Sequence, residues 1–170
     1  SDHQVENPNA LAVNASLRGS YEYIQINTWM TNDGIRDFLY YSPLGHVLAQ
    51  LGQTEEVRIS TDNLLVNPHK TFGWHQDNQT GPIDVDDALR FWGTLDACGP
   101  GTGAPEYLLG SHRTSAGSRD TCYVQLGAGG EGGETAAWAV EPGDLLVWHC
   151  RTIHQLLVPE RATWDAESRR

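Results

Sequence analysis

A histidine and an aspartate two residues apart, His75 and Asp77, form the first pattern with chemical meaning in this sequence. On a strand, residues i and i+2 project from the same face, so this imidazole and carboxylate would point to one place. A third ligand from another strand would complete the 2-His-1-carboxylate set that holds non-haem iron(II) and leaves three positions open. The later segment 149–154 offers two histidines for that role, His149 and His154.

The context of the pair strengthens this interpretation, because an H-x-D pair alone often arises by chance. The pair lies at the end of a predicted strand. The simpler alternative to a metal site is a surface histidine that forms a hydrogen bond with the neighbouring aspartate. Further along the chain, the turn Pro142-Gly143-Asp144 leads into an apolar strand that delivers the second histidine-containing segment.

The segments around these candidate ligands have the sequence pattern of a mainly β protein. From residue 57 onward, short β-prone segments alternate with turns rich in glycine and proline, which is typical of a sandwich or jelly roll. The predicted strands there are 57–66, 71–77, 88–96, 106–109, 121–126, 135–140 and 143–149.

The N-terminal part of the chain predicts one more strand and two helices. Residues 21–29 alternate with period 2, as a strand does. Asn32 or Asp33 can cap a helix that runs to about residue 41. A second helix opens at Ser42-Pro43 and ends near Gly52.

Composition limits the classes of protein that remain. The 170 residues suggest one compact domain, residues 1–170. The net charge of −11, from 11 Lys and Arg against 22 Asp and Glu, argues against a nucleic-acid binder or a protein of anionic membrane surfaces. No apolar run approaches the ~18 residues that a membrane-spanning helix needs. Three cysteines without a C-x-x-C pair, Cys98, Cys122 and Cys150, predict free thiols in a reducing compartment, so a cytoplasmic protein is expected.

Five segments, in their order and spacing, resemble one known family. They are the strand Ile24-Gln25-Ile26-Asn27 with Trp29, the helix pair ending Leu51-Gly52, Trp74-His75-Gln76-Asp77, Leu108-Leu109-Gly110-Ser111-His112-Arg113, and Pro142-Gly143-Asp144 before the distal histidine. Over about residues 21–170 the chain is similar to the phytanoyl-CoA dioxygenase family of iron(II)/2-oxoglutarate-dependent oxygenases.

The resemblance implies a double-stranded β-helix, which is a cupin-like jelly roll, with flanking helices. It also implies that His75 and Asp77 are the proximal iron ligands. His154 matches the distal ligand, because the family's histidine follows a short turn after the end of a strand. His149 then has a structural role on that strand.

The family anchors 2-oxoglutarate with an arginine on the strand after the distal histidine. Arg169 matches that position best, with Arg170 and Arg161 as the next candidates. A guanidinium group can bind the distal carboxylate through two parallel hydrogen bonds. Gln76 and Trp92 match positions that line the cosubstrate site in similar proteins.

The chain also departs from the family pattern. Gln155-Leu156-Leu157 stand where the family commonly has Gly-Ser and then Asn, so its usual hydroxyl contact to the cosubstrate is not expected here. The chain is short for the family and stops at Arg170, where a closing strand would be expected.

The resemblance implies a reaction in which Fe(II), 2-oxoglutarate and O₂ together oxidise a C–H bond of a small molecule. Related halogenases replace the carboxylate ligand by a small residue, so the presence of Asp77 favours hydroxylation, desaturation, epimerisation or ring closure. The many aromatic residues suit a rigid, partly apolar substrate. Similar short proteins often tailor natural products, and we expect a small-molecule substrate of that kind.

Two other classes of function remain open. A cupin-like metal isomerase or dioxygenase would use the three ligands without 2-oxoglutarate, and its activity would survive Arg169→Ala. A non-catalytic jelly-roll binding module would bind no iron or manganese tightly.

Overall fold

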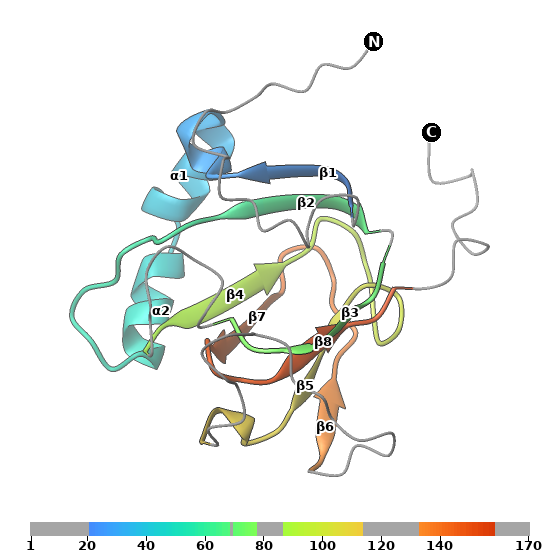
Figure 1. Cartoon of the computed structure of the whole chain (residues 1–170). Helices are drawn as coiled ribbons and strands as arrows, with labels where there is room; N and C mark the ends of the chain where they lie inside the picture. The colour runs from blue at the N-terminus through green and yellow to red at the C-terminus, as the bar shows by residue number, and fades with distance from the viewer. Residues whose placement is uncertain (1–20, 69, 78–86, 114–132, 159–170) are drawn as a thin grey trace. The chain divides into compact units, whose positions relative to one another are not determined.

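The computed structural model describes residues 21–68, 70–77, 87–113 and 133–158 (Figure 1). The chain divides into two compact units, Ser1–Asn67 and Pro68–Arg170. Whether the two units make one domain over 1–170 stays a prediction. Among the described residues, no helix has the length and apolar character that crossing a membrane requires.

The two α-helices found among the described residues lie in the first unit. α1 (Asp33–Tyr41) begins where the sequence predicted, because the side chain of Asn32 accepts a hydrogen bond from the Ile35 amide at 3.0 Å. α2 (Leu44–Leu51) follows Pro43, whose φ of −64° suits a helix start. Strands β1 (Tyr21–Ile26) and β2 (Asn63–Pro68) pair in a two-stranded sheet.

The predicted strand over 21–29 is too long by three residues. Asn27 takes a left-handed conformation with φ 53°, and Thr28–Met30 form the 3-10 helix η2. The carboxylate of Asp62 accepts hydrogen bonds from the amides of Thr28 and Trp29, at 3.0 and 3.3 Å. This contact joins residues more than 30 positions apart, so the local period of the sequence could not reveal it.

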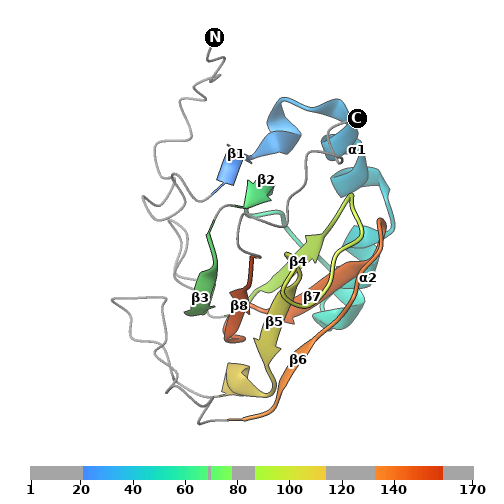
Figure 2. The same cartoon turned by 90° about the vertical axis from the view of Figure 1, so that its right-hand side faces the viewer.

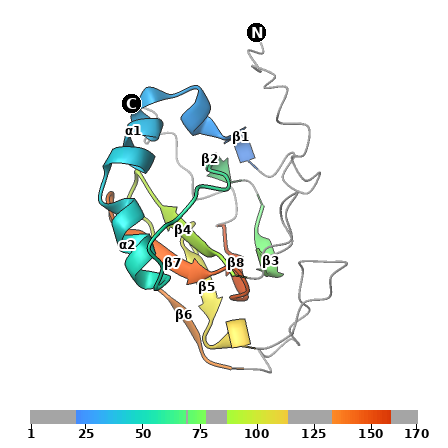
Figure 3. The same cartoon turned by 90° about the vertical axis from the view of Figure 1, so that its left-hand side faces the viewer.

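The described residues of the second unit form six strands in two antiparallel sheets. Figures 2 and 3 show these strands from opposite sides. The larger sheet has the order β3-β8-β5-β6 and the smaller is the pair β4-β7. The strands are β3 (Phe72–His75), β4 (Leu89–Gly93), β5 (Pro105–Leu108), β6 (Thr135–Ala137), β7 (Leu145–His149) and β8 (His154–Leu156), and the 3-10 helix η3 (Ser111–Arg113) follows β5. Mainly strands with two helices were predicted, and the structure confirms this.

β8 is the strand that the sequence analysis did not predict. Its three residues are too few for a period to appear, and their strand conformation comes from pairing with β3 on one edge and β5 on the other. The predicted strand 121–126 lies outside the described residues. The turn before β8 is anchored by two fully buried side chains, since Cys150 is 0% and Ile153 is 1% exposed. Cys98 is a free thiol, as predicted, while Cys122 lies outside the described residues.

Candidate metal centre

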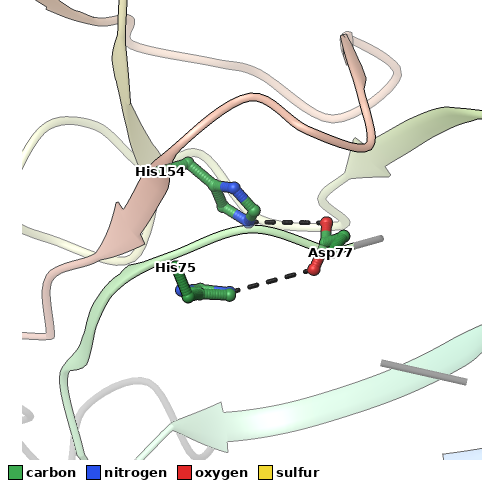
Figure 4. Close-up of side chains that lie close together, drawn as sticks. All are labelled: His75, Asp77 and His154. Carbon is green, nitrogen blue, oxygen red and sulfur yellow. Dashed lines mark ion pairs between the residues drawn. The ribbon is translucent and has the colours of Figure 1, made fainter. Parts of the chain in front are cut away.

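His75, Asp77 and His154 come together in the larger sheet of the second unit (Figure 4). His75 ends β3 and His154 begins β8, and the two are partners across that antiparallel pair. Each of the three side chains offers one ligand atom, and these atoms all lie within 4.8 Å of one another. The two histidines and the aspartate that the sequence singled out thus form one cluster, and no second cluster of this kind occurs among the described residues.

Backbone carbonyls fix the orientation of both imidazoles. Nδ1 of His75 lies 2.7 Å from the carbonyl oxygen of Gly73, and Nδ1 of His154 lies 3.0 Å from that of Thr152. A carbonyl oxygen can only accept, so each Nδ1 carries a hydrogen, and in the neutral form of each ring Nε2 is the atom that can bind a metal. The two Nε2 atoms face the carboxylate of Asp77, at 3.9 Å from Oδ1 for His75 and 3.6 Å from Oδ2 for His154.

The cluster is largely shielded from water. The side chains of His75 and Asp77 are each 16% exposed and that of His154 is 8% exposed. Burial lowers the pKa of His154 below its ordinary value, and the nearby charge of Asp77 opposes this only in part. His154 is therefore neutral at neutral pH, the form in which an imidazole binds a metal.

The turn that delivers His154 is tied to both sides of the site. The amide of Asp77 donates to the carbonyl of Cys150 at 2.8 Å, and Nε2 of Gln76 donates to the carbonyl of Arg151 at 2.6 Å. On the other side, the amide of Ile153 donates to Oγ of buried Ser111 at 2.8 Å. These three hydrogen bonds set the distal histidine against the proximal pair.

The other residues that the sequence suggested have different surroundings. Gln76 is 3% exposed and donates to the turn just described, and its predicted contact with the cosubstrate stays a prediction. Trp92 lies on β4 opposite Leu146 and is half-buried. Arg161, Arg169 and Arg170 lie outside the described residues.

His149 does not belong to the cluster. Its Nε2 lies 3.5 Å from Oδ1 of Asp87, and its Nδ1 accepts a hydrogen bond from the amide of Arg151 at 3.2 Å. The choice between the two late histidines, which the spacing alone left open, thus falls on His154 in this geometry.

Three residues beside the cluster were not assigned to the metal site from the sequence. Arg90 and Trp148 both reach Asp77, and the ring of Tyr107 stacks on that of His154 at 6.0 Å. A signal was present in the sequence for Arg90 alone: residues i and i+2 of a strand share a face, so Arg90 lies on the same face as the candidate residue Trp92. Their approach to the ligands depends on how β4, β5 and β7 pair, which no local pattern reveals.

A cavity of about 490 Å³ adjoins this group of rings. Its walls are mostly apolar and aromatic, and they include Tyr107, Leu109, His112, Trp138, Leu145 and Trp148. Trp148 and Tyr107 also contact the ring of His154, so the cavity lies next to the cluster. The hydroxyl of Tyr107 is buried and has no hydrogen-bond partner among the described residues. Burial and the charge of Asp77 raise the pKa of Tyr107, which keeps this hydroxyl protonated.

Two neutral imidazoles and one carboxylate are the donor set of the non-haem iron(II) enzymes. The fold and this cluster define a jelly-roll protein with a candidate metal centre of that type. The model of one family, described as phytanoyl-CoA dioxygenase (PhyH), matches residues 37–155. The chain belongs to this family, as its resemblance predicted.

Solved structures give the same picture of the fold. AviO1 from Streptomyces viridochromogenes Tue57 is 22% identical with a TM-score of 0.61, over 81% of this chain and 60% of that one. The epimerase SnoN, in complex with Fe3+, alpha ketoglutarate and nogalamycin RO, is 15% identical with a TM-score of 0.60, over 84% of this chain and 58% of that one. A second structure, described as the non-heme alpha ketoglutarate dependent epimerase SnoN from nogalamycin biosynthesis, is 18% identical with a TM-score of 0.61, over 79% and 56%.

These likenesses confirm the jelly-roll fold class. The chain spans less than two thirds of the length of each of these proteins, at 56–60%. A comparison with curated protein sequences gives no match.

Proposed function

We propose that this chain is an Fe(II)/2-oxoglutarate-dependent oxygenase that acts on a C–H bond of a small, partly apolar molecule. The observation that carries the proposal is the convergence of two Nε2 lone pairs and one carboxylate within 4.8 Å. Membership of the phytanoyl-CoA dioxygenase family supports it, as does the presence of Fe3+ and alpha ketoglutarate in the similar SnoN structure.

In this proposal His75, Asp77 and His154 hold the iron. Three protein ligands leave positions on the metal for the cosubstrate and for dioxygen. The bound iron and 2-oxoglutarate would supply the oxidising chemistry. The chain itself orients the two imidazoles through the carbonyls of Gly73 and Thr152, and it keeps water away by burying His154.

The binding of 2-oxoglutarate involves residues that stay predictions. Arg169 is the proposed anchor of its distal carboxylate, with Arg170 and Arg161 as alternatives, and Gln76 and Trp92 are proposed to line its site. One N–H of the Gln76 amide already donates to the carbonyl of Arg151, which leaves its second N–H and its oxygen for a ligand.

The substrate class is proposed from the cavity and from the relatives. Aromatic and aliphatic walls around about 490 Å³ suit a rigid, partly apolar molecule. SnoN is described as an epimerase of nogalamycin biosynthesis, which supports natural-product tailoring by this chain. Hydroxylation and epimerisation or cyclisation are all compatible with Asp77, since the carboxylate ligand is present.

Consumption of the cosubstrate tests this proposal without knowledge of the substrate. The purified chain, loaded with Fe(II) and given 2-oxoglutarate in air, is expected to form succinate slowly, and a panel of aromatic natural products is expected to include compounds that accelerate it. His75→Ala should abolish the succinate. Tight iron binding without any succinate would favour the isomerase class, and no tight iron binding would favour the binding module.

A further inference from the structure

We propose that Arg90 and Trp148 together hold the carboxylate of Asp77 in its metal-binding orientation before the metal arrives. We call this pair the Asp77 brace. The inference rests on the proposed metal site, and it assigns positioning roles to two residues that do not touch the metal themselves.

Trp148 supplies a hydrogen bond to one oxygen of the carboxylate. Its Nε1 donates to Oδ2 of Asp77 at 3.3 Å. The same indole packs on the ring of His154, with centroids 5.1 Å apart, and on Tyr107 at 5.3 Å. These two ring contacts limit the rotation of the indole, so the position of its N–H is well defined.

Arg90 supplies a second contact that joins the main chain and side chain of Asp77. Its Nη2 donates to the carbonyl oxygen of Asp77 at 2.9 Å, and its Nε lies 3.8 Å from Oδ2. The side chains of Arg90 and Asp77 are 28% and 16% exposed, so water screens this ion pair less than it screens one at the surface. The planar guanidinium group can reach the main-chain oxygen and Oδ2 of Asp77 at once through two of its nitrogens. An ammonium group has a single nitrogen and cannot do this.

The two brace residues lie on the sheet that carries none of the three ligands. Arg90 on β4 and Trp148 on β7 are directly opposite each other in that antiparallel pair. Partners in a pair project from the same face, so both side chains reach Asp77 from one side. The brace therefore couples the β4–β7 sheet to the end of β3, where Asp77 follows His75.

A carboxylate that is already oriented loses less freedom when it binds a metal. Outer contacts of this kind typically contribute 10- to 100-fold to metal affinity. We therefore expect each brace contact to strengthen metal binding by about tenfold, with little effect on the metal-free fold.

Mn(II) titration of the full chain without 2-oxoglutarate tests the brace. Trp148→Phe removes the N–H donor but keeps an aromatic ring. Arg90→Lys keeps the positive charge but removes the planar guanidinium group with its several N–H donors. Each is expected to weaken Mn(II) binding about tenfold, while the melting temperature of the metal-free protein changes little. Trp138→Phe and Arg113→Lys are the matched controls, because neither residue contacts Asp77, and their Mn(II) affinities should equal that of the wild type.

Four outcomes would be decisive. Wild-type Mn(II) affinity in both brace variants overturns the brace. Normal Mn(II) affinity with weaker 2-oxoglutarate binding in Arg90→Lys also overturns it, because Arg90 would then act on the cosubstrate. If one brace variant fails to fold, the Mn(II) affinity of the other still tests the brace, since each variant removes a separate contact with Asp77. A wild-type chain that binds no Mn(II) contradicts the proposed function itself.

Discussion

The two sheets of the second unit differ in regularity, and the irregular one carries the ligands. β4 and β7 pair without interruption from Leu89–His149 to Gly93–Leu145. β3 and β8 pair at Phe72–Leu156 and at His75–His154, and their register shifts between these two points. Such irregularities redirect side chains and occur often beside active sites.

This difference suggests a division of roles between the sheets. The shifted β3–β8 pair brings His75 opposite His154, and the chain after β3 then turns Asp77 toward both rings. The regular β4–β7 pair presents Arg90 and Trp148 in fixed register to the same carboxylate. One sheet and the bend after β3 thus provide the ligands, and the other sheet supports them.

The largest effect is expected from the ligands on the irregular sheet. His154→Ala removes one of the three proposed metal ligands. Mn(II) affinity should therefore fall by more than about 100-fold, which is the largest loss usual for a residue that only supports a ligand. The metal-free protein should lose some stability, because the buried imidazole packs on Trp148 and Tyr107 and bonds to the Thr152 carbonyl, so circular dichroism must show that it is still folded. Calorimetric titration and circular dichroism measure the two quantities, and retained tight binding would exclude His154 as a ligand.

The turn between the two sheets should show a combined effect on stability and metal binding. Ser111→Ala leaves the buried amide of Ile153 without its acceptor, so the free energy of unfolding should fall by about 1–3 kcal/mol. Mn(II) affinity should fall as well, because this hydrogen bond holds the turn before His154. Chemical denaturation with parallel Mn(II) titration checks both changes. A loss of stability with unchanged affinity would separate the turn from the metal site.

The pH dependence of stability should reveal the burial of His154. The unfolded chain takes up a proton on this histidine near pH 6.5, and the folded chain does so only at lower pH. The unfolded state thus binds more protons below pH 6.5, so the metal-free fold loses stability as the pH falls through that range. The melting temperature should drop more between about pH 7.5 and 5.5 in the wild type than in His154→Gln. An equal drop in the melting temperature of the wild type and of His154→Gln would contradict a neutral, buried His154.

The smallest effect is expected at the neighbour of a ligand on the same strand. Gln155 follows His154, so it points to the opposite face of the sheet, where its Nε2 donates to Glu106 at 2.6 Å. Gln155→Ala should cost about 1 kcal/mol or less and leave Mn(II) affinity unchanged. A large loss of affinity would show that the site depends on both faces of β8.

The sequence revealed the ligands better than it revealed their supports. The i, i+2 spacing singled out His75 and Asp77, and Asn32 is a typical helix cap, so local rules found these residues. The predicted strand over 71–77 is nevertheless too long, because β3 ends at His75 and Asp77 lies in the bend that follows. β8 has three residues and no readable period, and its conformation depends on two neighbouring strands. The contacts of Arg90 and Trp148 with Asp77 join residues 13 and 71 positions apart, and only strand pairing brings them together.

Anaerobic titration of the Fe(II)-loaded chain with 2-oxoglutarate tests the central claim most directly. Bidentate binding of the cosubstrate to iron gives a weak visible charge-transfer band. We predict that the wild type develops this band, that His75→Ala and His154→Ala lose it, and that Arg169→Ala weakens it. A fully metal-loaded wild type that gives no band would contradict 2-oxoglutarate-dependent chemistry at this site.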